Sequence, residues 1–343
     1  MKRIMATLLL LGSAAIVPAA EAQTLRERIR ERIEERRNQP ATQAPDAAAK
    51  TAAPLAPGDH QRRLDHGGLQ RRYLIHVPPG LDPAKPAALL LAFHGGGGHA
   101  EYMADDSRYG LLGQADRSGF VVVFPNGYSR FPGGRLATWN AGGCCGDARD
   151  KGIDDVGFVR AIVADVQARV TVDPQRIFAT GMSNGGMMAY RLACEAADVF
   201  RAVAAVAGTE AVAQCRPSRP VAILHIHARN DTHVLFNGGA GPDAFRDTAK
   251  VMDFVAAPET VSRWAVRNQC VASPQRVLEV PGGYCERYTG CRSGSPVQLC
   301  VTESGGHSWP GARTVRPGKE AASQALDANE QMWSFFAELP PRP

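Results

Sequence analysis

A serine flanked by glycines, in the pattern G-x-S-x-G centred on Ser183, is the group of residues best suited to covalent chemistry. Residues 176–180 have the composition of a short buried strand, and residues 187–193 that of a helix. A serine on so sharp a turn exposes its hydroxyl above the sheet, and small neighbours let strand and helix approach closely. The backbone N–H of Asn184 would then face the oxygen of an acyl group. The pattern predicts a nucleophilic Ser183; the alternative is an ordinary glycine-rich turn.

A serine nucleophile needs a base that takes its proton and an acid that orients the base. Asp231 directly follows an apolar run at 221–227, and His307 lies in a glycine-flanked loop late in the chain. Both come after Ser183, in the order Ser, Asp, His that such elbows use. We therefore predict Asp231 as the acid, although it could merely cap its loop, and His307 as the base. His233 is the one serious competitor for the role of base. It lies only two residues from Asp231, which is too close for Asp231 to orient its ring comfortably.

Four glycines follow His94 at the end of the apolar run 87–93. Without side chains, their backbone N–H groups can approach a ligand closely. We expect Gly96 to supply a second oxyanion donor beside Asn184, with Gly97 as the next choice. His94 itself is expected to hold this loop rather than to take part in chemistry. The alternative is a flexible turn.

These candidate residues need a scaffold that brings distant segments to one place. Near-continuous apolar runs predict strands that are buried on both faces, and a helical periodicity occupies 154–170. The runs lie at 72–77, 87–93, 120–124, 177–180, 202–207 and 221–227. Their alternation with helices predicts an α/β domain with a mostly parallel sheet. The candidate residues follow strand ends, where function gathers in sheets of this kind.

The 343 residues divide into three expected parts. Residues 1–22 combine a basic start, an apolar run and an A-x-A ending, which predicts a signal peptide cleaved after Ala22. Residues 23–58 comprise an arginine-rich arm at 24–38 and a linker rich in alanine and proline. Residues 59–339 form the catalytic domain. We expect a secreted or periplasmic protein without a stable membrane span.

Charge and cysteine content exclude several classes of partner. The formal net charge of +5 is too modest and too mixed to indicate nucleic acid. All eight cysteines lie in the predicted domain, and an even number in an exported chain indicates disulfides. No C-x-x-C pair is present and Cys144 and Cys145 are adjacent, so zinc is not expected. We also predict no other metal and no cofactor.

Disulfide pairing is expected within two groups of four cysteines. We favour pairing within a late group, in which Cys285 and Cys300 would face each other across a hairpin. Cys270 and Cys291 complete that group. The four earlier cysteines would then pair among themselves.

Together, these stretches resemble the secreted esterases grouped as polyhydroxybutyrate depolymerases and feruloyl esterases. The resemblance covers roughly residues 71–333 and rests on His94-Gly95, Thr138–Gly146, Asp154–Phe158, the Ser183 elbow and Gly305–Pro310. It implies an α/β-hydrolase fold in a single domain, with Ser183, Asp231 and His307 as the catalytic triad.

The resemblance also implies that Trp139, Asn140 and Trp309 lie near the substrate. The alternatives are core packing for the two tryptophans and a turn role for Asn140. One departure is Ala228, where many family members have glycine. It predicts a different loop geometry around Asp231 without loss of that residue.

The leading hypothesis is a secreted serine carboxylic-ester hydrolase with an acyl-enzyme mechanism. Its partner would be an ester substrate, either a feruloyl or other aromatic ester of polysaccharide or a short hydroxyalkanoate ester. The alternatives are a serine peptidase of the same fold and a non-catalytic binding protein. The oligomeric state is not indicated.

Overall fold

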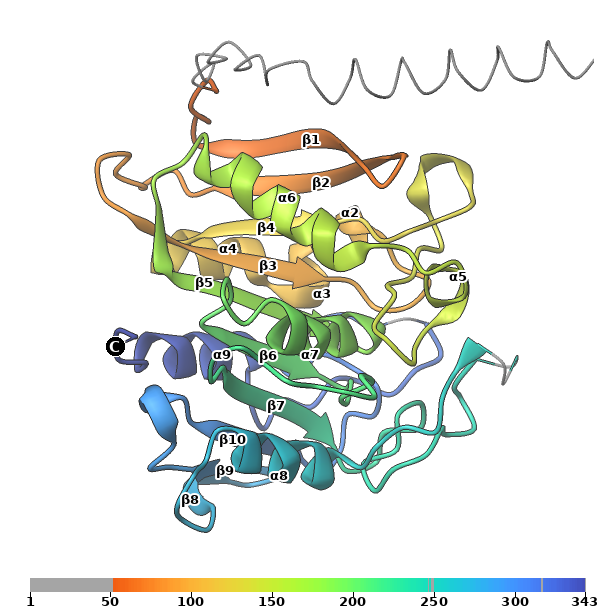
Figure 1. The fold of residues 1–343 in the computed structure, drawn as a ribbon. Helices are drawn as coiled ribbons and strands as arrows, with labels where there is room; N and C mark the ends of the chain where they lie inside the picture. The colour runs from red at the N-terminus through yellow and green to blue at the C-terminus, as the bar shows by residue number, and fades with distance from the viewer. Residues whose placement is uncertain (1–51, 246, 248–249, 316, 343) are drawn as a thin grey trace, which may run out of the picture. The chain divides into compact units, whose positions relative to one another are not determined.

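A computed structural model describes residues 52–342 of the chain apart from residues 246, 248–249 and 316 (Figure 1). The expected signal peptide, the arginine-rich arm and most of the linker lie outside the described residues. No helix in the described part is long and apolar enough to cross a bilayer.

Ten strands form one sheet in the order β1-β2-β4-β3-β5-β6-β7-β10-β9-β8 (Figure 1). The strands are β1 Gly58–His66, β2 Leu69–Val77, β3 Ala87–Phe93, β4 Val121–Pro125, β5 Val172–Met182, β6 Ala202–Val206, β7 Ala222–Ala228, β8 Gln275–Val280, β9 Gly283–Tyr288 and β10 Val297–Thr302. The central strands from β4 to β10 run parallel, and an antiparallel pair extends the sheet at each end. The predicted mostly parallel α/β fold is confirmed.

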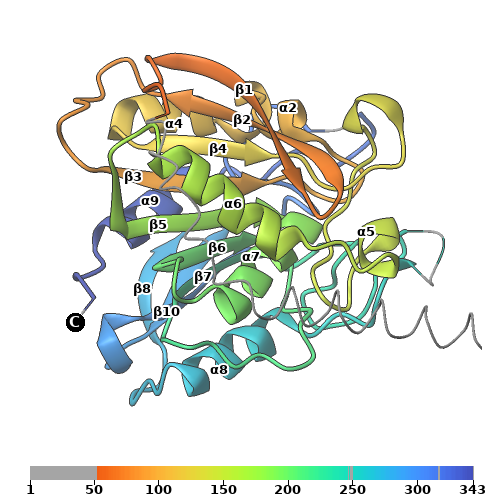
Figure 2. The same cartoon turned by 45° about the horizontal axis from the view of Figure 1, so that its top comes forward.

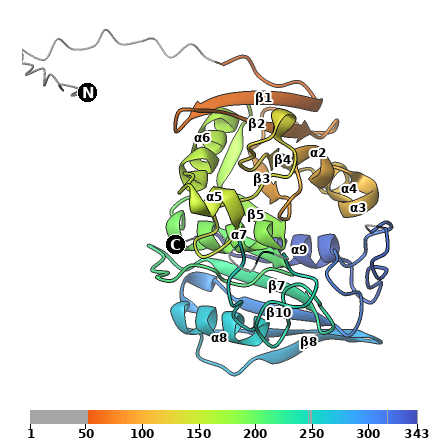
Figure 3. The same ribbon diagram turned by 90° about the vertical axis from the view of Figure 1, so that its right-hand side faces the viewer.

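Helices cover both faces of this sheet. On one face lie α6 Asp155–Gln167, α7 Asn184–Glu195 and α8 Ala257–Arg267, in front of the strands in Figures 1 and 2. The other face carries α2 Ala100–Met103, α3 Asp106–Tyr109, α4 Leu111–Ser118 and α9 Ala328–Ala337, as the side view in Figure 3 shows. The short α5 Gly146–Asp150 lies in a loop near one end of the sheet (Figure 1).

The central strands are apolar throughout because both of their faces are covered. Every residue of β3 is buried, and successive side chains enter opposite layers: Leu89 and Leu91 face α6 and α7, whereas Leu90 and Ala92 face α4 and α9. The edge strand β1 instead alternates between half-buried and exposed residues. Its sequence of mixed polar and apolar residues therefore lacks the continuous run by which the central strands were predicted.

The eight cysteines form four disulfides: Cys144–Cys145, Cys194–Cys215, Cys270–Cys291 and Cys285–Cys300. The expected grouping is confirmed. Cys285 of β9 is directly opposite Cys300 of β10 in the antiparallel register, as predicted for two cysteines across a hairpin.

Candidate active site

Ser183 occupies the turn between β5 and α7 and has a strained backbone. Its φ is 56° and its ψ is −124°, a region that residues with side chains rarely adopt. The Ser183 N–H donates to the carbonyl of Val206 at 2.8 Å. A Cβ added to Gly185 would collide with the carbonyl oxygens of Phe93 and His94. The elbow therefore requires glycine where the helix crosses the end of β3.

Asp231 lies just beyond β7 and is wholly buried. Its Oδ1 accepts the N–H groups of His233 at 2.7 Å and Val234 at 3.1 Å, which fixes the carboxylate plane. Its Oδ2 lies 2.8 Å from Nδ1 of His307 and 3.3 Å from Nε2 of His227. Burial alone would raise the pKa of Asp231, but the charge of His307 and hydrogen bonds from both histidines outweigh it. The pKa therefore lies well below its usual range, and the group is a carboxylate at neutral pH.

His307 follows β10 in a loop held from two sides. The N–H of Gly306 donates to the side chain of Asn230, and the N–H of Gly305 donates to Glu320. Because the carboxylate of Asp231 accepts at Nδ1, that nitrogen carries the proton and Nε2 keeps its lone pair. The ring is thus in the tautomer that a general base for Ser183 requires.

Ser183 and His307 line the same cavity, which has a volume of about 580 Å³. Part of its wall is apolar, with Met187, Val234 and Phe254. Another part is an aromatic series in which Tyr109 makes edge-to-face contacts with both Tyr102 and Trp309. The cavity therefore combines apolar and aromatic side chains with a strained serine.

The glycine loop after β3 reaches the same cavity. Gly95 and Gly96 both line it, and a Cβ on Gly95 would lie 3.5 Å from Cβ of Ser183. A Cβ on Gly96 would lie 3.6 Å from Cβ of Asn184, so the two expected N–H donors are neighbours. The second choice, Gly97, is ruled out because its N–H already donates to the carbonyl of Ala137 at 2.8 Å.

The side chain of Asn184 anchors the loop that contains Trp139. The amino-acid sequence shows no sign of this role. Its Oδ1 accepts the N–H of Trp139 at 2.7 Å, and its Nδ2 donates to the carbonyl of Trp139 at 3.0 Å. Both polar atoms of the amide are therefore used inside the protein. What Asn184 can still offer a ligand is its backbone N–H at the start of α7.

Trp139 and Asn140 do not contact the cavity. The Trp139 indole is fully buried, packs against Phe93 and His94, and donates to the carbonyl of His94 at 3.0 Å. The Asn140 side chain bonds Ile153 and Gly142 and so shapes its turn. The substrate role implied for both is thus replaced by packing and turn formation. Of the three residues, only Trp309 lines the cavity.

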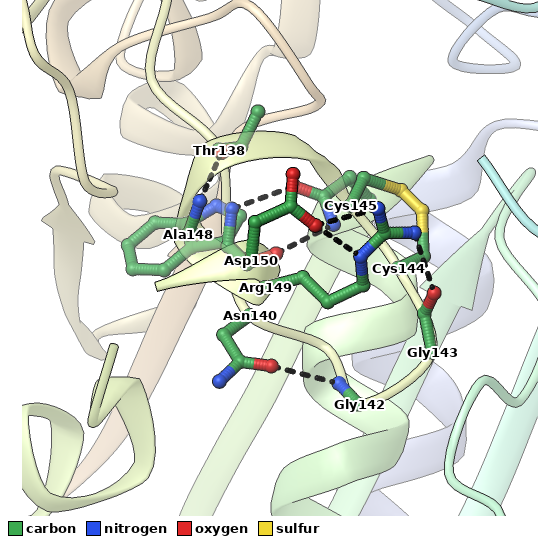
Figure 4. The surroundings of a disulfide bond; sticks show 11 residues. Thr138, Asn140, Gly142, Gly143, Cys144, Cys145, Ala148, Arg149 and Asp150 are labelled. Carbon is green, nitrogen blue, oxygen red and sulfur yellow. Dashed lines mark hydrogen bonds and ion pairs between the residues drawn. A yellow bond between two sulfur atoms is a disulfide. The ribbon is translucent and has the colours of Figure 1, made fainter. Parts of the chain in front are cut away.

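The disulfide between adjacent Cys144 and Cys145 belongs to the same loop (Figure 4). Cys145 lines the cavity, and its N–H donates to the carbonyl of Trp139 that also receives Asn184. Arg149 donates to the carbonyl of Gly143 at 3.2 Å, closing the loop from the other side (Figure 4). Cys145 thus forms part of the cavity wall and is tied to the elbow through the carbonyl of Trp139.

His94 holds its loop, as expected. Its Nε2 accepts the N–H of Gly127 at 3.0 Å, so its Nδ1 donates to the carbonyl of Gly95 at 2.9 Å. Burial lowers the pKa of His94 to about 4, which keeps the ring neutral. A neutral ring with both nitrogens occupied serves structure rather than proton transfer.

A buried chain of hydrogen bonds lies behind Asp231, and the sequence showed no sign of it beyond two histidines in a strand. The Nε2 of His227 donates to the carbonyl of Val234, so its Nδ1 accepts from Nε2 of His225, whose Nδ1 in turn accepts from the hydroxyl of Tyr190. Burial lowers the pKa of His225, so that ring is neutral at neutral pH. It fixes His227 beside Asp231.

Ala228 is the last residue of β7 and pairs with Thr302 of β10. It does not occur among the described non-glycine residues with positive φ. Alanine therefore fits at position 228 without backbone strain, and Asp231 lies three residues later.

Two groups of side chains have the composition of a metal site among the described residues. Cys194 and Cys215 beside Glu210 are joined in a disulfide and so lack thiolates. Asp231, His233 and His307 form the second group. The two imidazole planes there are nearly parallel, so their lone pairs do not converge on one point.

The chain is similar to several known esterases. Residues 71–238 match the model of the family described as Esterase PHB depolymerase. A feruloyl esterase B of Piromyces equi is 34% identical over 243 residues, which are 69% of this chain and 42% of that protein. The putative esterase NocK of Nocardia uniformis subsp. tsuyamanensis is 33% identical, over 79% of this chain and 78% of its own length. This chain thus spans under half of the length of the feruloyl esterase B but most of the length of NocK.

A probable feruloyl esterase C of Aspergillus niger is 33% identical over 78% of this chain and 83% of its own length. Among solved structures, an acetyl xylan esterase from Aspergillus awamori superposes with a TM-score of 0.51 at 15% identity. That match covers 81% of this chain and 99% of the esterase chain. The likeness supports an α/β-hydrolase fold and nothing finer.

Proposed function

The chain belongs to the Esterase PHB depolymerase family, and we propose that it is a secreted serine hydrolase of carboxylic esters. The observation that carries this proposal is that His307, paired with Asp231, lines the same cavity as the strained Ser183. The names of the relatives support the ester class.

In this mechanism, Nε2 of His307 takes the hydroxyl proton of Ser183 as Oγ attacks the ester carbonyl carbon. Asp231 holds the ring and stabilises the imidazolium. The N–H groups of Asn184 and Gly96 receive the oxyanion. The C–O bond to the alcohol then breaks, and His307 returns its proton to the leaving oxygen. Water, activated by the same ring, hydrolyses the acyl-enzyme.

The substrate class that the cavity favours is an ester with an aromatic acyl group, such as a feruloyl ester of polysaccharide. Tyr102, Tyr109 and Trp309 line the cavity, and aromatic side chains pack favourably against an aromatic ring. A short hydroxyalkanoate ester is the second candidate, which the family description favours. Hydrolysis of methyl ferulate and of hydroxybutyrate oligomers, compared by kcat/KM, decides between them.

The test of the nucleophile is the variant Ser183→Ala. It should lower kcat on the better ester by about 10⁶-fold and abolish labelling by an organophosphonate. Ser334→Ala is a matched control, because Ser334 lies on α9 and bonds only the exposed Glu338. If Ser183→Ala keeps full activity, the assignment of the nucleophile is wrong.

Export is part of the proposal. All the described cysteines are in disulfides, which suits an oxidising compartment. Expression of the full chain should yield a protein outside the cytoplasm that begins at Gln23. A cytoplasmic product that still carries residues 1–22 would contradict this.

A further inference from the structure

We propose that His233 is a positioning residue whose neutral ring, stacked on His307, orients that base and stabilises its protonated form. This inference rests on the proposed function. The sequence presents His233 only as a rival base close to Asp231. The contacts of its ring and of its backbone give it a different task.

The two imidazoles are stacked face to face. Their ring centroids are 4.3 Å apart, and their planes differ by 13°. Both rings line the cavity that contains Ser183. A flat face at this distance restricts rotation of His307 about its side-chain bonds, which a single hydrogen bond to Nδ1 does not do.

One carboxylate sets the position of both rings. Oδ2 of Asp231 accepts from Nδ1 of His307, while Oδ1 accepts the backbone N–H of His233 at 2.7 Å. The segment that carries the stacking ring is therefore fixed to the same group that holds the base. Asp231 thereby sets the distance between the rings as well as the tautomer of His307.

His233 is suited to remain uncharged. Its Nδ1 is buried and has no hydrogen-bond partner among the described residues, so a proton there would be unsatisfied. Burial and then the charge of His307 lower the pKa of His233 to about 4, with Lys319 in the same sense and Asp231 and Asp243 opposing it. At neutral pH, His307 therefore faces the π surface of an uncharged ring.

A neutral aromatic face next to an imidazolium stabilises the cation. During both steps of acyl transfer His307 becomes an imidazolium, so the stack acts when the proton is on the base. A side chain that only filled the same space would exclude water equally but would lack the π face that stabilises the cation. This difference makes the two roles separable by experiment.

The test uses His233→Phe and His233→Leu in the full chain. Both side chains exclude water and neither titrates, but only phenylalanine presents a flat π face. We expect His233→Phe to keep kcat/KM within about threefold of wild type, and His233→Leu to lose about 5- to 10-fold. The acid limb of the pH–rate profile should move to lower pH by about 0.5 in the leucine variant alone.

A second measurement does not depend on activity. Titration of the His307 imidazole by NMR, with its signal assigned from His307→Gln, should show the leucine variant protonating at lower pH than the other two proteins. Thermal unfolding midpoints identify a variant that has merely lost its fold. If the phenylalanine and leucine variants behave alike in both titration and rate, the stacking role is wrong. If the NMR shift occurs but no ester is hydrolysed, the proposed function fails and the stack stands.

Discussion

The substitution Asp231→Asn tests the geometry of the site most directly. An asparagine can still accept the N–H groups of His233 and Val234 through its oxygen. Its NH₂ group would then face Nδ1 of His307, where the carboxylate now accepts. A donor at this position forces His307 to carry its proton on Nε2, which can no longer take a proton from Ser183.

The expected loss is roughly 10⁴-fold in kcat/KM, or about 5.5 kcal/mol of transition-state stabilisation. It should appear in kcat and leave KM nearly unchanged, because the cavity wall is intact. The assay is steady-state hydrolysis of the better ester at pH 7. Asp198→Asn is a suitable control, since that carboxylate pairs with Arg160 on the surface. A variant at Asp231 that stays within tenfold of wild type would refute the assigned tautomer.

The same substitution has a pH signature in stability. The pKa of Asp231 is lower in the folded protein than the unfolded value of about 3.9. The carboxylate therefore contributes stability that is fully present above that unfolded value and is lost as the pH falls toward the folded one. In urea unfolding, the free energy of unfolding of the wild type should exceed that of Asp231→Asn by a constant amount above about pH 5. The difference should become smaller below about pH 4.

Three further substitutions test the scaffold. Gly185→Ala should prevent the elbow from forming, because the new Cβ meets carbonyl oxygens at the end of β3. We expect insoluble or inactive protein. Soluble protein with wild-type kcat would contradict this. Arg71→Met should lower the free energy of unfolding in urea by about 3–5 kcal/mol at pH 7, because it leaves the carboxylate of Asp155 buried without its charged partner. If this loss does not become smaller as the pH is lowered, the unpaired carboxylate is not its cause. Replacing Cys285 and Cys300 by alanine should cost about 2–4 kcal/mol by the same measurement while kcat stays unchanged, and a loss of kcat would show that this bridge reaches the cavity.

The sequence predicted the centre of the sheet well because its strands are buried on both faces. The apolar runs at 87–93 and 202–207 correspond closely to β3 and β6. The edge strand β1 alternates in burial and β8 is mostly exposed, and both include charged residues, so no continuous apolar run marks them. Their existence depends on pairing with neighbours, which a local pattern does not record.

The site residues also fall into two groups: those that a local sequence pattern marks and those whose position depends on contacts between distant segments. Asp231 and His307 could be predicted because they follow strands, and the fold places strand ends together. Trp139 could not be placed, because its burial depends on contacts with Phe93 and with the side chain of Asn184, which is 45 positions away. The stack of His233 on His307 likewise joins two loops that only the folded sheet brings together.

The four disulfides share a property that affects how the chain acquires them. Their sequence separations are 1, 21, 21 and 15 residues, so none joins parts of the chain that are distant in sequence. For the three bonds with separations of 15 to 21 residues, the two cysteines meet often even in an unfolded chain, because the entropy of closing a flexible loop grows with its length. In the exported protein that we propose, these three bonds can therefore form early, before the sheet is complete. The register of the parallel sheet is left to hydrophobic burial, without covalent ties between its distant strands.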